Sequence, residues 1–125
     1  MSSETLHEDA EVIGPAVIDR HRAIVSLMEE LEAVDWYDQR VAATQDPSLA
    51  AILAHNRDEE KEHASMVLEW LRRHDAVIDK QLRTYLFTEA PVTEVEAIAE
   101  AADGAAGSPS DGSLGIGSLK GRPHP

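Results

Sequence analysis

The stretch Asp58-Glu59-Glu60-Lys61-Glu62-His63-Ala64 decides how this chain folds. Glu60 and His63 stand three residues apart in a segment with helical periodicity, so their side chains lie on one helix face, one turn apart. Arg57, Lys61 and Glu62 point away from that face. The rest of the face is mostly apolar and comprises Leu49, Ile52, Leu53, Asn56, Val67, Trp70 and Leu71. Because a buried carboxylate needs a compensating partner, this stretch is typical of a bundle helix that carries half of a di-metal carboxylate site.

The residues on either side of this stretch predict an all-α fold. Helical periodicity covers about residues 16–43 and again 47–74, with a bend that continues into 76–87. Asp46 and Pro47 form the break, because an N-cap residue is followed by proline at the first helical position. The capping box Thr93-Glu94-Val95-Glu96 opens a short third helix that ends near residue 102. We therefore predict an antiparallel two-helix hairpin plus a short C-terminal helix, in one helical domain over residues 16–102.

Glu30 is the matching anomaly in the first helix. It is the one charged member of an otherwise uncharged helical row, Ala23, Leu27, Glu30, Val34, Tyr37 and Val41. Glu30 lies fifteen residues before the turn at residue 45, and Glu60 lies fifteen after it, so both stand roughly 22 Å from the turn. One hairpin supplies half of a di-metal ligand set, and a second copy supplies Glu30, Glu60 and His63 again. Four carboxylates balance two divalent cations, so we predict a homodimer that forms a four-helix bundle around a shared site.

The predicted ligands are oxygen and imidazole nitrogen, because the chain contains no cysteine. Such a set suits iron, manganese or zinc, and bridging carboxylates with open positions for O₂ suit the oxidation of Fe²⁺ to Fe³⁺. The alternative for Glu60 and His63 is an ion pair or hydrogen bond inside a helical core. The apolar surroundings of the pair and the equal height of Glu30 favour the metal site.

Three residues beside Glu30 allow two interpretations. Glu29, Glu32 and Trp36 fall on one side of the first helix. They form either a solvated helix face or a secondary cation site that passes iron towards the buried ligands. Tyr37 shares a row with Glu30, near the site, but we interpret both aromatic residues as packing residues rather than redox partners.

The formal net charge of the 125-residue chain is −13, from 24 acidic and 11 basic residues. That charge repels nucleic acid and anionic lipid and attracts divalent cations, although solubility alone also explains it. The first residues lack the apolar core of a signal peptide, and no run of about 18 apolar residues occurs. We therefore expect a cytoplasmic protein that contacts neither membrane nor nucleic acid.

Both ends of the chain have the composition of flexible segments. Residues 1–15 precede the first predicted helix, and residues 103–125 are rich in Gly, Ser, Pro and Ala. Three aliphatic residues, Leu114, Ile116 and Leu119, are spaced through glycines within residues 111–121. This segment is either a disordered end or a docking peptide that places its aliphatic side chains in apolar pockets of a partner.

Two motifs in the helices resemble the encapsulated ferritins. They are Met28-Glu29-Glu30-Leu31-Glu32-Ala33-Val34-Asp35-Trp36-Tyr37-Asp38-Gln39-Arg40 and His55-Asn56-Arg57-Asp58-Glu59-Glu60-Lys61-Glu62-His63-Ala64, and the similarity covers roughly residues 17–98. The tail Leu114-Gly115-Ile116-Gly117-Ser118-Leu119-Lys120-Gly121 resembles the targeting peptide by which such cargo docks inside an encapsulin shell. The two resemblances lie in separate parts of the chain and agree.

The resemblance implies a ferritin-like ferroxidase of the cytoplasm, held inside an encapsulin nanocompartment. Its dimers rebuild a four-helix di-iron site, with one iron per chain, and assemble as a ring-shaped decamer, a pentamer of dimers. Glu30, Glu60 and His63 match the ferroxidase ligands, and calcium, zinc or manganese can replace iron at the metal sites. Glu29 and Glu32 match metal-uptake residues, and Trp36 sits beside that uptake path. Fe²⁺ and O₂ are the implied reactants, and ferric mineral collects in the shell.

Two other functions stay open at this point. A di-metal peroxidase of rubrerythrin type normally has more Glu-x-x-His motifs in one chain or cysteine-bound iron, whereas the predicted helices of this chain contain one such motif, Glu60 to His63, and the chain has no cysteine. A non-catalytic helical adaptor, targeted by its tail, would need none of the three ligands. Substitution of Glu30 or His63 distinguishes the adaptor from the ferroxidase, because only the ferroxidase would lose Fe²⁺ oxidation.

Overall fold

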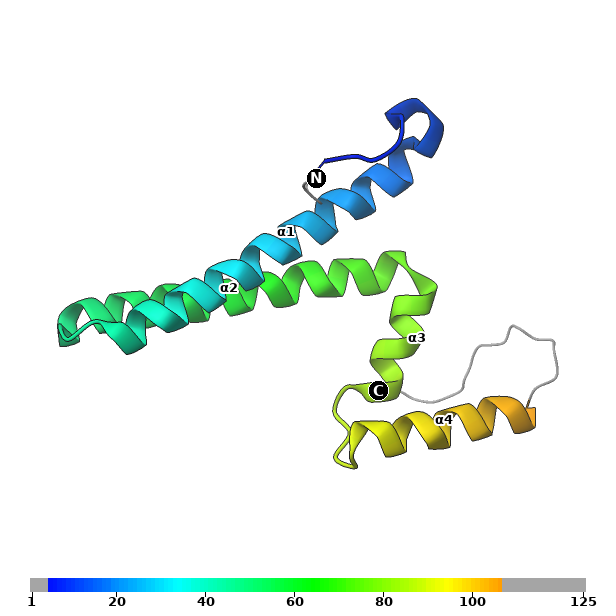
Figure 1. The fold of residues 1–125 in the computed structure, drawn as a ribbon. Coiled ribbons are helices and arrows are strands. Elements are labelled where there is room, and N and C mark those ends of the chain that lie inside the picture. Colours follow the sequence, from blue (N-terminus) through cyan, green and yellow to red (C-terminus); the bar gives the residue numbers. More distant parts are fainter. Residues whose placement is uncertain (1–4, 107–125) are drawn as a thin grey trace. The chain divides into compact units, whose positions relative to one another are not determined.

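The structure is a computed structural model that describes residues 5–106 of the chain. Within these residues it contains four helices and no strand: α1 (Ala10–Ala43), α2 (Pro47–His74), α3 (Ala76–Tyr85) and α4 (Val92–Ala106) (Figure 1). The predicted all-α class is therefore confirmed. The chain divides into two units, one up to Ala76 and one from Val77.

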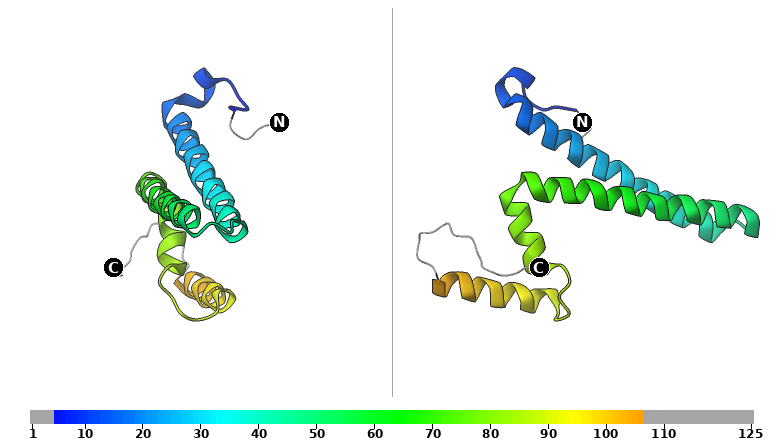
Figure 2. Two further views of the ribbon diagram at one scale, coloured as in Figure 1. Left: turned by 90° about the vertical axis from the view of Figure 1, so that its left-hand side faces the viewer. Right: turned by 180° about the vertical axis from the view of Figure 1, so that it is seen from behind.

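Helices α1 and α2 form the predicted antiparallel hairpin. They lie side by side near their connecting turn and diverge towards the other end, as the views in Figures 1 and 2 both show. Asp46 caps α2, because its Oδ1 accepts hydrogen bonds from the backbone N–H groups of Ser48 and Leu49 at 2.9 and 3.2 Å. Pro47 occupies the first turn, as predicted. The turn thus fixes where α2 begins and, through it, the height of every residue on that helix.

Helix α1 begins six residues earlier than predicted. The backbone of Gly14 has φ 84°, a left-handed conformation that glycine adopts without strain, and Pro15 follows it inside the helix. The result is a kink that separates a short N-terminal helical piece from the long helix that follows. The predicted start near residue 16 corresponds to the first residues after this kink.

The second unit contains α3 and α4. Helix α3 ends at Tyr85, two residues before the predicted end of its segment. Helix α4 runs to Ala106 and so includes residues 103–106, which the composition had assigned to the C-terminal linker. An ion pair joins the two helices, with 3.3 Å between Lys80 Nζ and Asp103 Oδ2.

Within residues 5–104, whose burial the structure describes, a single copy of the chain has almost no core. Among the side chains that the structure describes, only Ala64 and Leu71 are buried, at 6% and 3% relative exposure. Large apolar side chains on both helices of the hairpin remain exposed, including Ile24, Leu31 and Ile52. In the part of the chain that the structure covers, no helix is both long and apolar enough to cross a bilayer.

Candidate metal centre

Glu30 of α1 and the pair Glu60 and His63 of α2 come together as the sequence predicted. One potential ligand atom of each residue lies within 4.8 Å of the other two. His63 Nδ1 is 3.4 Å from Glu60 Oε1 and 3.7 Å from Glu30 Oε1. Within residues 5–106, these three residues are the one group of histidines and carboxylates found close enough to hold a metal ion.

Local structure explains the convergence. Glu60 and His63 are one turn apart on α2, and the capped turn at Asp46 sets Glu30 at their level on α1. The side chains of Glu30 and Glu60 are each 25% exposed and that of His63 is 42% exposed. The cluster therefore lies along the seam between the helices, with one side open to solvent or to a second molecule.

The charge of the cluster favours a bound cation. A hydrogen bond with the Glu60 carboxyl raises the pKa of Glu30, and burial and the negative charge of Glu60 raise it further. The charge of His63 lowers that pKa, and Glu29 raises it slightly. Without a cation, Glu30 therefore keeps its proton to a higher pH than an isolated carboxyl group does. A divalent ion would displace the proton and neutralise the two carboxylates.

The donor set fits a transition-metal ion. Ligand atoms about 2.1 Å from a common ion stand roughly 3.0–3.4 Å apart, close to the 3.4 and 3.7 Å measured from His63 to the two carboxylates. Two carboxylates and one imidazole suit iron, manganese or zinc. Three ligands leave such an ion short of its usual four to six, so a single chain offers an incomplete site.

The other predicted site residues of α1 lie outside this group. Glu29, Glu32 and Trp36 are exposed, and the three-residue cluster does not include them. Tyr37 is half-buried on the row that carries Glu30. The guanidinium of Arg40 lies 5.6 Å from the Tyr37 ring centroid and 6.0 Å from that of Trp36, a cation–π contact that the sequence analysis did not anticipate.

Arg57 is the residue near the site that sequence reasoning missed. The helical repeat placed it away from the ligand face, yet its side chain is only 21% exposed and reaches α1, where Nη1 lies 3.0 Å from Asp38 Oδ1. An arginine one turn from a ligand was the available signal, but Asp38 lies roughly 7.5 Å nearer the turn at residue 45 than Arg57 does, so residue spacing alone does not pair them. The predicted docking peptide, Leu114-Gly115-Ile116-Gly117-Ser118-Leu119-Lys120, lies outside the described residues.

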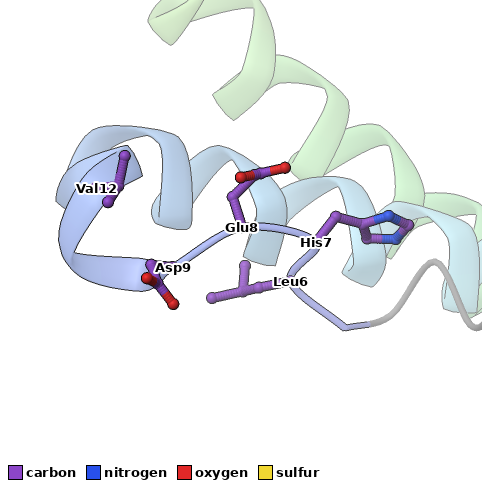
Figure 3. Close-up of a pocket in the computed structure, with 5 residues that line it drawn as sticks. All are labelled: Leu6, His7, Glu8, Asp9 and Val12. Carbon is purple, nitrogen blue, oxygen red and sulfur yellow. The ribbon is translucent and has the colours of Figure 1, made fainter.

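A second group of acidic and histidine residues near the N-terminus is not a candidate site. A shallow hollow there is lined by Leu6, His7, Glu8, Asp9 and Val12. Figure 3 shows that the Glu8 and Asp9 carboxylates point in different directions, and the His7 ring does not approach them. These residues do not form a ligand group in the described part of the chain.

Comparisons with known proteins place the chain in a family. The sequence pattern of the EncFtn-like family matches residues 5–89. The chain is 63% identical to the "Encapsulated ferritin-like protein" of Rhodospirillum rubrum over 127 residues, which is 96% of this chain and 91% of that protein. It is 35% identical to the "Encapsulin nanocompartment cargo protein EncC" of Myxococcus xanthus over 106 residues, covering 77% and 80% of the two.

A solved structure agrees with these relatives. The crystal structure of a protein from Nitrosomonas europaea superimposes with a TM-score of 0.68 at 59% sequence identity, covering 70% of this chain and 96% of that one. The helical hairpin and the resemblance of its two motifs therefore point the same way as the sequence comparisons. This chain belongs to the EncFtn-like family, the encapsulated ferritin-like proteins.

Proposed function

We propose that this protein is a ferroxidase that oxidises Fe²⁺ to Fe³⁺ at a di-iron site shared by two copies of the chain. The observation that carries the proposal is the convergence of Glu30, Glu60 and His63 within 4.8 Å on two helices. Fe²⁺ is the substrate, and O₂ accepts its electrons. Each chain would hold one iron through His63, while the carboxylates of Glu30 and Glu60 hold or bridge both.

Two features of the single chain support a dimer. The three ligands are half of the set that a di-iron carboxylate site uses, and a second copy related by two-fold symmetry would supply the other half. The hairpin also leaves Leu49 and Ile52 44% and 56% exposed, on the stripe that carries Glu60 and His63. Pairing of two such faces would cover these side chains and close the open side of the cluster.

Metal binding and assembly should be coupled in this arrangement. Four carboxylates brought together without a cation repel one another; within one chain the pKa of Glu30 is raised by its hydrogen bond with Glu60, by burial and by the charge of Glu60. Binding of Fe²⁺ would release the Glu30 proton and remove the repulsion, so Fe²⁺ promotes dimer formation. Size-exclusion profiles with and without Fe²⁺ test this coupling, and identical profiles would contradict it.

Exposed acidic residues of α1 would deliver the substrate. Glu29 and Glu32 are solvent-accessible and belong to the same helix as Glu30, and Trp36 is exposed beside them. In a chain with a net charge of −13, these carboxylates would capture Fe²⁺ and pass it to the shared site.

The relatives support a place inside a protein shell. One is named as encapsulated and another as a cargo protein of an encapsulin nanocompartment. We extend that role to this chain: its tail around Leu114, Ile116 and Leu119 would dock it inside a cytoplasmic encapsulin compartment, where ferric mineral collects. Within the compartment, dimers would assemble as a ring-shaped decamer.

An anaerobic Fe²⁺ titration followed by O₂ addition tests the activity. The proposal requires about one iron per chain and rapid formation of Fe³⁺, with both lost in Glu30→Gln and in His63→Ala. Glu62→Gln is the matched control, because it removes the same charge from an exposed position of α2 near the ligands. If the three variants oxidise Fe²⁺ like the wild type, the ferroxidase proposal is wrong and the adaptor function gains support.

A further inference from the structure

A charged network joins α1 and α2 next to the candidate metal centre. Arg57 Nη1 lies 3.0 Å from Asp38 Oδ1 of α1, and Arg57 Nε lies 3.1 Å from Asp58 Oδ1 of α2. Lys61 Nζ is 3.5 Å from the same Asp58 oxygen. The planar guanidinium uses separate N–H groups for the two aspartates, a geometry that a lysine ammonium does not reproduce. Arg57 thereby connects the two helices through a directional contact.

This contact lies where the single chain has little apolar packing to hold its helices. The two side chains that are buried in the described part of the hairpin, Ala64 and Leu71, both follow His63 and so lie beyond the site as seen from the turn. Between the turn and Glu60, no described side chain is buried. The connection of three residues between Ala43 and Pro47 sets the approximate level of the two helices, but apolar rows that repeat every three to four residues do not by themselves distinguish registers one turn apart, about 5.4 Å.

Such a slip would separate the ligands. The cluster spans at most 4.8 Å, which is less than one helical turn, so a one-turn slip would carry Glu30 out of reach of His63. Arg57 lies about 4.5 Å along α2 from Glu60, and Asp38 lies about 12 Å along α1 from Glu30, on the side of the turn in both cases. The contact is thus placed between the turn and the ligands on both helices.

We infer that Arg57 is a positioning residue, whose contact with Asp38 holds α1 in the register that brings Glu30 to Glu60 and His63. The inference rests on the proposed metal site, because register matters only if the three side chains bind together. Arg57 touches neither the ion nor the substrate in this role. Loss of the contact lowers metal affinity although none of the three ligand residues is substituted.

Fe²⁺ binding measured anaerobically by calorimetry tests the inference. Arg57→Gln and Asp38→Asn should each weaken Fe²⁺ binding about five-fold, the upper range for one partly exposed ion pair. The double variant should be no weaker than either single variant, and the exchanged pair Arg57→Asp with Asp38→Arg should recover most of the affinity. If the substitutions acted through a general loss of stability, their effects on Fe²⁺ affinity would add in the double variant, and exchanging the two charges would not restore the affinity.

Arg22→Gln serves as the matched control. Its guanidinium lies 2.8 Å from Asp19 within α1, so the substitution breaks an ion pair of the same kind that joins no second helix. We expect its Fe²⁺ affinity to equal that of the wild type. An equal loss of affinity in Arg22→Gln and Arg57→Gln would overturn the inference.

Register is measured without metal by disulfide trapping, which is clean because the chain has no cysteine. Val34 and Asn56 each lie eleven residues from the turn at residue 45, so we expect Val34→Cys with Asn56→Cys to crosslink in the native register and Val34→Cys with Leu53→Cys after a slip of about one turn. Arg57→Gln should raise the share of the slipped crosslink within single chains. An unchanged share refutes the positioning role, whereas a wild-type protein that binds no Fe²⁺ refutes the proposed function and leaves the trapping result to be judged separately.

Discussion

Ile52→Ala should weaken the proposed dimer about 100-fold. Ile52 is 56% exposed in the single chain and lies on the stripe with Glu60 and His63, so the proposed interface would cover it. The substitution removes three carbon groups, each worth about 0.8 kcal/mol when fully buried, or about 1.3 kcal/mol for the fraction still exposed in the single chain. Two-fold symmetry doubles the loss to roughly 2.7 kcal/mol, which is about a factor of 100 in the dissociation constant.

Sedimentation velocity over a range of protein concentrations measures this loss. Val12→Ala is the control, because Val12 is 78% exposed but lies before the kink at Gly14, away from the ligand rows. We expect the control to dimerise like the wild type. If Ile52→Ala dimerises as tightly as Val12→Ala, the stripe around Glu60 is not the interface, and the shared di-iron site loses its physical basis.

Three further substitutions test other parts of the structure. The raised pKa of Glu30 stabilises the metal-free fold below the ordinary carboxyl pKa, and this contribution to the free energy of unfolding is lost as pH rises through the raised value. In urea unfolding curves, Glu30→Gln should therefore make the free energy of unfolding depend less on pH. Asp46→Ala removes the cap of α2 and should lower the free energy of unfolding by about 1 kcal/mol in thermal melts, with Asp46→Asn close to wild type. Leu71→Ala should lower it by about 2–5 kcal/mol at fixed protein concentration, and an unchanged urea midpoint would show that Leu71 is not buried.

Helix boundaries were predictable where a local signal specifies them. Asp46 and Pro47 mark the start of α2, because capping and proline geometry depend on neighbouring residues alone. Gly14 and Pro15 mark the kink in α1. The sequence did not show that the residues preceding them, from Ala10, are also helical. The extension of α4 to Ala106 was missed because the glycine and serine that follow suggest a linker. The alanines of this stretch favour helix and were the signal for the longer α4.

The ligand cluster was predictable because it follows from helix geometry. The equal distances of Glu30 and Glu60 from a defined turn place them at one height, and the three-residue spacing of His63 adds the third ligand. The contact between Arg57 and Asp38 was not predictable in the same way. A long side chain reaches its partner according to how two helices cross, which residue spacing does not encode. The dimer remains a prediction, which the Ile52→Ala experiment tests.

Only Ala64 and Leu71 are buried among the side chains that the structure describes, and this has a consequence for how the protein responds to dilution. So small an interior does not offset the conformational entropy of ordering two helices of 34 and 28 residues. We therefore expect most of the free energy that orders the hairpin to come from contact with another molecule, as the proposed dimer would provide. Dilution would therefore favour unfolding, and the melting temperature should rise with each tenfold increase in protein concentration.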